Sequence, residues 1–219
     1  MRGAAEGEGG GPAVVELRGG PEELGHGHGE QVRDGVRAAC EAVRAYLDRV
    51  RRFAPGSLVA AVLKLAARFM IGYAPADYRR EMEALAEAAG VDRGSVFLLN
   101  AFDDIGANLA CTAFAVLGGD DGVVLGRNLD YPVFTDEMCA LSTVFRFRPA
   151  SGRDFLSVAW PGYIGAVTAM NSAGLAVASL ASPSPERTLR GVPLGLLYRR
   201  AVQYGKDLDD LVEVLRRGP

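Results

Sequence analysis

The periodicity of the apolar residues changes at Cys111, and this change constrains the fold of the 219-residue chain more than any other feature. Before Cys111, apolar residues recur at helical spacing, most clearly from Glu30 to Phe53. After it come short runs of alternating residues, separated by turns rich in Gly, Ser and Asp, which is typical of antiparallel strands. The pattern therefore predicts four helices, about six strands and two closing helices, an α+β fold with a layered core.

Punctuating residues indicate where the helices before Cys111 begin and end. A Pro-Gly pair at 55–56 separates the first helix from the second. Pro75 suits the first turn of a third helix, which Gly90 ends, and Asp92 can cap a fourth over RGSVFLLNAFDDIG. After Cys111, the runs LSTVFRFR, FLSVAW, YIGAVTAM and LAVASL are expected to be strands.

Composition excludes several classes of protein. Hydrophobic residues make up 49% of the chain and charged residues 23%, as in ordinary globular proteins. The net charge of -3 shows no excess of basic residues, so we expect no nucleic-acid partner. The most apolar stretch, SLVAAVLKLAARFMIGY, contains Lys64 and Arg68 and is too short to span a bilayer.

The terminal segment and the cysteines favour a cytoplasmic protein. Residues 1–12 have the composition of a flexible tail and lack the apolar region of a signal peptide. The three cysteines show no metal or redox spacing, and an odd number argues against a disulfide scaffold. Cys40 borders the apolar face of the first helix and Cys139 matches no motif, so both are expected to be buried small hydrophobic residues.

If Cys111 is a nucleophile, it needs a base, and histidine is scarce. The chain has two histidines, His26 and His28, in a Gly-rich segment before the first helix. That position favours a packing role against the helix, although a cysteine–histidine enzyme that uses one of them stays open. Two histidines without a third ligand nearby do not predict a metal site.

The α-amino group of Cys111 is the other candidate base, once the bond between Ala110 and Cys111 is cleaved. A free α-amine titrates near about 7.7–8.0 and a cysteine near about 8.5, so the two groups are matched for proton exchange. Threonine nucleophiles paired with an N-terminal amine use the same device. The change from helices to strands at Cys111 fits a boundary between two pieces.

A hairpin brings two charged residues toward Cys111. If TAFAVL and VVLGRN pair symmetrically around GGDDG, Cys111 faces Leu129, and Arg127 and Asp130 lie within two residues of that position. An Arg beside a cysteine favours the thiolate, and an Asp could hold the new ammonium. Strict alternation puts Arg127 and Asp130 on opposite faces, so both can serve Cys111 only if the strand bends near Leu129. A surface ion pair at the end of a strand is the alternative.

The sequence CTAFAV…GRNLDYP resembles the start of the mature catalytic subunit in cysteine N-terminal nucleophile hydrolases. In that superfamily Arg and Asp follow the cysteine by 16 and 19 positions, as Arg127 and Asp130 follow Cys111. Two more stretches, LRGGPEELGHGHGEQVRD and WPGYIGAVTAMNSAGLAVA, resemble motifs of its penicillin acyltransferase-like branch (acyl-CoA:6-aminopenicillanic acid acyltransferase). Acid ceramidase, N-acylethanolamine amidase and choloylglycine hydrolase are relatives of this branch.

The resemblance implies roles for individual residues. Cys111 would be the nucleophile and, through its amine, the base, while Arg127 and Asp130 position both groups. Asn171 would donate to the oxyanion, although its place in the turn NSAG also suits a plain turn residue. Tyr131 would line the substrate pocket.

The resemblance also implies a fold and a reaction. The fold would be a four-layer αββα sandwich, incomplete at the C-terminus because family members are longer. Residues 13–110 would form a helical pro-part and residues 111–219 a strand-rich catalytic part. The protein would cleave itself and then act as an amidase or acyltransferase on linear non-peptide amides, through a thioester and without a cofactor. Its partner would be a small N-acyl amide or acyl donor; a catalytically inactive binding protein of the same fold is the alternative.

Overall fold

The computed structural model describes residues 12–50, 56–106, 110–119, 122–130, 135–180 and 188–218. Its elements in chain order are β1 (Ala13–Gly19), α1 (Pro21–Gln31), α2 (Arg33–Val50), α3 (Gly56–Ile71), α4 (Ala76–Ala89), α5 (Arg93–Gly106), β2 (Ala110–Gly119), β3 (Gly122–Asp130), α6 (Thr135–Ala140), β4 (Thr143–Pro149), β5 (Phe155–Ala159), β6 (Thr168–Asn171), β7 (Ala176–Ala178), α7 (Leu194–Tyr204) and α8 (Leu208–Arg217).

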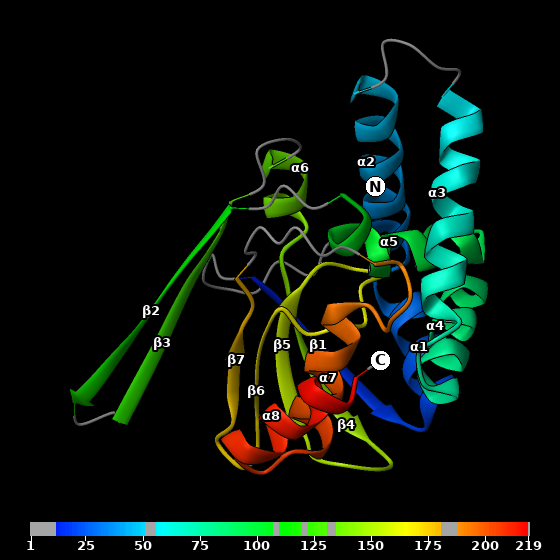
Figure 1. Cartoon of the computed structure of the whole chain (residues 1–219). Helices are drawn as coiled ribbons and strands as arrows, with labels where there is room; N and C mark the ends of the chain where they lie inside the picture. Colours follow the sequence, from blue (N-terminus) through cyan, green and yellow to red (C-terminus); the bar gives the residue numbers. More distant parts are fainter. Residues whose placement is uncertain are drawn as a thin grey trace.

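The strands form two separate sheets (Figure 1). Five of them make one sheet in the order β1-β4-β5-β6-β7, in which β1 runs parallel to β4 and the other pairs are antiparallel. The other sheet is the β2–β3 hairpin, which extends away from the body of the molecule. The predicted α+β class is therefore confirmed.

Helices cover one face of the five-stranded sheet. Phe145 and Phe147 of β4 are buried on that face, where the ring of His28 from α1 lies 4.5 Å from Phe145. The other face carries apolar side chains that are exposed among the described residues, such as Val158 at 44% and Met170 at 50%. The described residues thus show a helical layer, one sheet and a separate hairpin, and the four-layer arrangement stays a prediction.

Most of the expected elements are confirmed. Val36, Ala39, Val43 and Leu47 of α2 are buried, as the helical spacing predicts. The carboxylate of Asp92 caps α5 by accepting from the backbone N–H groups at positions 94 and 95, at 2.9 and 3.1 Å. The backbone of Gly90 has φ +66° where α4 ends, in the left-handed region that glycine adopts without strain.

Some elements differ from the expectations. The strand β1 and the helices α1 and α6 were not predicted, and only the end of YIGAVTAM, from Thr168, is a strand. GHGHG, expected to precede the first helix, lies within α1, because its glycines allow this helix to pack closely against α4. The prediction that Cys139 is buried is wrong: it lies exposed on α6, because its neighbour Met138 is the residue that points inward. Residues 1–11, the expected tail, lie outside the described residues. None of the described helices is long and apolar enough to cross a membrane.

The glycines of GHGHG have a packing role. A Cβ on Gly25 would lie 2.1 Å from the backbone oxygen of Glu81, and one on Gly29 would lie 2.6 Å from that of Leu85. Both carbonyls belong to α4, so the glycines allow the backbones of α1 and α4 to approach closely. This approach brings His28, between them on α1, into the core.

Gly25→Ala is expected to lower the free energy of unfolding by about 1–3 kcal/mol, because the new methyl group must displace a helix backbone. Gly27→Ala is the matched control: its Cβ would meet side-chain atoms only at 3.6 Å or more. The control should raise stability by about 0.5–1 kcal/mol, since Ala favours helices over Gly. Urea denaturation measures both, and equal effects of the two substitutions would contradict the close packing.

Candidate active site

The β2–β3 register places Cys111 opposite Leu129, as predicted from the symmetry of the hairpin. Cys111 is half-buried and belongs to the same face of the hairpin as Arg127, which pairs with Ala113. The side chain of Arg127 reaches along this face to the sulfur, with Nη2 lying 3.5 Å from Sγ. The structure therefore brings the predicted nucleophile and the predicted arginine together.

Arg127 is held in this position by the five-stranded sheet. Its Nε donates to the backbone oxygen of Ser179, at 2.8 Å, and its Nη1 donates to Oγ1 of Thr168, at 3.1 Å. Thr168 begins β6 and Ser179 follows β7. Sequence reasoning missed both partners; the only signal was that Thr168 belongs to the motif quoted around Asn171.

Asp130 lies beside the bond that was predicted to be cleaved. It pairs with Ala110 in the hairpin, so the Cα atoms of these two residues are about 4.5–5.5 Å apart. Alternation places the exposed side chain of Asp130 on the face opposite that of Cys111 and Arg127. Whether the chain bends beyond Asp130 concerns residues 131–134, and Tyr131 with them lies outside the described residues.

Asn171 is placed elsewhere, at the far end of β6 from Thr168, about 10 Å along the strand. Its Nδ2 donates to the backbone oxygens of Val202 and Gly205, both at 2.8 Å. Its Oδ1 accepts from the backbone N–H groups at positions 173 and 175, at 3.0 and 3.1 Å. The side chain thus ties the β6–β7 turn to the end of α7, and its role as an oxyanion donor stays a prediction that would require these contacts to break.

The two histidines take no part in the contacts of Cys111. His28 is fully buried, and its Nε2 accepts a hydrogen bond from the backbone N–H of Gly162, at 2.9 Å. Burial, reinforced by the charge of Arg199, lowers the pKa of His28 to about 3, so the ring is neutral. His26 is exposed beside Glu30. The described residues contain no group of three His, Cys, Asp or Glu side chains that could hold a metal ion.

Comparisons with known proteins relate this α+β chain to one family. Residues 117–219 match the family of acyl-coenzyme A:6-aminopenicillanic acid acyl-transferase. The resemblance to this family of N-terminal nucleophile hydrolases is thereby confirmed. The matched region includes Arg127, Asp130 and Asn171 and begins six residues after Cys111.

Three curated proteins are also similar to the chain. An uncharacterized protein of Archaeoglobus fulgidus is 28% identical over 95% of this chain, and protein dcd1A of Dictyostelium discoideum is 22% identical over 90%. Acid ceramidase of Rattus norvegicus is 24% identical over 58% of this chain. The matches cover 39%, 51% and 34% of these proteins, so the chain spans about half of their length or less.

The buried neutral His28 predicts a specific pH dependence of stability. Its pKa is about 3 in the folded protein and about 6.5 in the unfolded chain. Between these two pH values the unfolded chain binds a proton on this ring and the folded protein does not. The free energy of unfolding should therefore fall, by up to about 1.4 kcal/mol per pH unit from this group, as pH drops below 6.5. Urea denaturation at pH 7.5 and 5.0 measures it.

His28→Gln should flatten this pH dependence, whereas His26→Gln, which changes an exposed histidine, should keep it. Asp104 contributes with the opposite sign, because burial raises its pKa to about 6, but it is present in all three chains and cancels in the comparison. An unchanged slope in His28→Gln would show that His28 is not buried as a neutral base.

Proposed function

We propose that the protein is a self-cleaving cysteine amidase or acyltransferase of the N-terminal nucleophile type. The observation that carries the proposal is the contact of 3.5 Å between the sulfur of Cys111 and Nη2 of Arg127, in a chain similar to this family. Cys111 is the nucleophile, and Arg127 and Asp130 are its neighbours at the position where a new N-terminus would form. Ala110 supplies the carbonyl of the cleaved bond.

The maturation step converts one peptide bond into a carboxylate and an amine. The sulfur of Cys111 attacks the carbonyl carbon of Ala110 and the C–N bond of the peptide breaks. The thiol proton moves to the leaving nitrogen, which becomes an α-amine. Water then hydrolyses the resulting thioester, which leaves a carboxylate on Ala110 and a free thiol on Cys111. Asp130 pairs with Ala110 across the hairpin, which places its backbone beside this bond.

The mature site acts on a linear, non-peptide amide by the same chemistry. The sulfur of Cys111 attacks the acyl carbon, while the α-amine takes the thiol proton and passes it to the leaving nitrogen. The amide C–N bond breaks and the acyl group stays on sulfur as a thioester. Water, or a second nucleophile in an acyltransferase, then attacks the thioester, and its proton returns to sulfur as the acyl group leaves. This scheme uses no cofactor.

Several contacts would keep the two pieces together after cleavage. β1, from the first piece, pairs with β4, from the second, over the whole of Ala13–Gly19. Glu81 and Arg199, one from each piece, form a buried ion pair. We therefore propose residues 13–110 and 111–219 as two chains of one folded unit, with the four-layer sandwich as its fold.

The 219-residue chain is expected to split between Ala110 and Cys111 into pieces of 110 and 109 residues, the second beginning Cys-Thr-Ala. The pieces should elute together in native size-exclusion chromatography and separate in denaturant. Intact mass and N-terminal sequencing identify the cut. The experiment is run on this chain and on one extended to the length of its relatives.

Cys111→Ala should leave a single chain, whereas Cys139→Ala, which removes the exposed cysteine of α6, should be cleaved normally. Cleavage of the Cys111→Ala chain, or a different new N-terminus, would rule out Cys111 as the nucleophile of maturation. A stable single chain of wild-type sequence at both lengths would instead favour the inactive binding protein.

Asn171→Ala separates the two roles of this residue. Because its side chain satisfies two buried carbonyls and two N–H groups, we expect the free energy of unfolding to fall by about 1–3 kcal/mol. If Asn171 also donates to the oxyanion, turnover per folded molecule falls at least about a hundredfold. Near-normal turnover would mean that Asn171 stabilises the turn and does not donate to the oxyanion. Ser172→Ala, in the same turn and exposed, is the control.

A further inference from the structure

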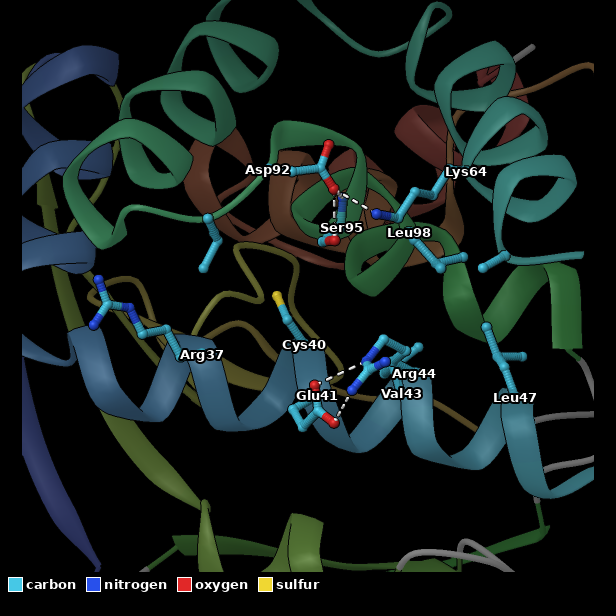
Figure 2. A pocket seen from close by; sticks show the side chains of 12 residues that line it. Arg37, Cys40, Glu41, Val43, Arg44, Leu47, Lys64, Asp92, Ser95 and Leu98 are labelled. Carbon is cyan, nitrogen blue, oxygen red and sulfur yellow. Dashed lines mark hydrogen bonds and ion pairs between the residues drawn. The ribbon is translucent and has the colours of Figure 1, made fainter. Parts of the chain in front are cut away.

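A cavity of about 280 Å³ lies between α2, α3 and the start of α5, in the helical layer (Figure 2). Val43, Leu47 and Leu98 are buried residues that give it an apolar lining. The half-buried thiol of Cys40 points into it from α2 (Figure 2). Burial raises the pKa of Cys40 to about 11, so the thiol adds a neutral, weakly polar surface.

Charged side chains also line this cavity, and most of them already have partners. Lys64 Nζ lies 2.5 Å from Asp92 Oδ2, whose carboxylate also accepts from the hydroxyl of Ser95 at 2.7 Å. Partial burial raises the pKa of Asp92, but these contacts outweigh it and lower the pKa to about 2, so the carboxylate is ionised. Arg44 pairs with Glu41 on α2.

Arg37 is the exception among the charged lining residues. Its Nε donates to the backbone oxygen of Ala89, at 3.0 Å, and this anchors the guanidinium at the end of α4. Within the described residues, no carboxylate lies at ion-pair distance from Arg37. Arg37 is exposed, and its guanidinium lies on the side away from Cys40 (Figure 2), so a cation without a carboxylate partner stands at one end of an apolar interior.

We propose that this cavity binds an amphipathic monocarboxylate with a single medium-length alkyl chain. The carboxylate accepts from the free nitrogens of Arg37, and the chain passes Cys40 toward Leu47. Ten residues separate Arg37 from Leu47, about 15 Å along α2, which leaves room for an extended chain of this kind. A cavity of about 280 Å³ is below the usual range for drug-sized ligands, and so favours one narrow chain.

This inference goes beyond the proposed function and does not depend on it. Every residue that lines the cavity lies in the range 37–98, before Cys111, and the hydrogen bonds of Arg127 among the described residues go to Ser179, Thr168 and Cys111 instead. The site would be a ligand site of the helical layer. A carboxylate bound at Cys111 is distinguished from it by the variants below.

The probe is sodium octanoate, titrated calorimetrically into the full chain, with acetate and 1-octanol as partial ligands. We expect octanoate to bind with a dissociation constant of about 0.01–1 mM, and both partial ligands to bind at least tenfold more weakly. Saturating octanoate should slow the alkylation of Cys40 by N-ethylmaleimide at least about fivefold, resolved by peptide mass spectrometry. Cys139, exposed on α6, is the internal control and should react at an unchanged rate.

Arg37→Gln should weaken octanoate binding about tenfold, and Arg37→Lys, which keeps the charge, should restore it to within about threefold. Arg68→Gln removes the same charge from α3 outside this cavity and should change the affinity less than twofold. Ala60→Leu fills the cavity and should abolish the protection of Cys40. Cys111→Ala should bind octanoate as the wild type does.

The proposal is overturned if saturating octanoate leaves the alkylation of Cys40 unchanged. Equal losses of octanoate affinity in Arg37→Gln and Arg68→Gln would show that only the net charge of the protein matters. If 1-octanol binds as tightly as octanoate, the carboxylate has no role in binding. Binding that is lost in Cys111→Ala but kept in Arg37→Gln and Ala60→Leu would place the ligand at the other site.

Discussion

A fully buried ion pair between Glu81 of α4 and Arg199 of α7 joins the part of the chain before Cys111 to the part after it. Two hydrogen bonds of 2.7 Å connect the guanidinium to both carboxylate oxygens, and the ring centroid of Phe147 lies 4.8 Å from its central carbon. Removing one partner of such a pair leaves an unpaired charge in the core, which typically costs about 3–5 kcal/mol. The pair therefore favours the one arrangement of α4, α7 and the sheet in which the two side chains stay in contact.

This arrangement of helices against the sheet supports the buried segment 160–167, which connects β5 to β6 without forming a strand. Its backbone groups need partners from elsewhere, because buried N–H and C=O groups are costly when unsatisfied. The side chains of His28, Asn100 and Arg199, from three different helices, supply them for Gly162 and Ile164. The segment leads directly into Thr168, so the contacts that satisfy it also position the hydroxyl that accepts from Arg127.

The same physics explains which features the sequence could predict. The β2–β3 register follows from a short turn and strict alternation, both local, so Cys111 opposite Leu129 and Arg127 on the same face could be predicted. β1 could not, because its parallel partner β4 lies about 130 residues away. The segment 163–167 has the composition of a strand, yet Ile164 bonds to the side chains of Asn100 and Arg199 on two helices, and the N–H of Ala166 bonds to the backbone oxygen of Gly195. No local pattern indicates these distant partners. For Asn171, the turn and the family motif predicted different roles; its observed contacts hold the turn and tie it to the end of α7, and the oxyanion role stays a prediction.

The site finally depends on the shape of one side chain. The outer half of the hairpin is exposed, with Leu117 at 77% and Phe114 at 59%, so it adds little packing against the body. Arg127 connects its inner half to β6 and β7 by donating in two directions while a third nitrogen faces the sulfur of Cys111. A lysine would donate from a single nitrogen on a flexible stem, whereas the planar guanidinium holds three nitrogens at fixed separations and in fixed directions, one toward each of these partners. Arg127 thus both connects the hairpin to the sheet and positions Cys111, so the fold and the candidate site depend on the same side chain.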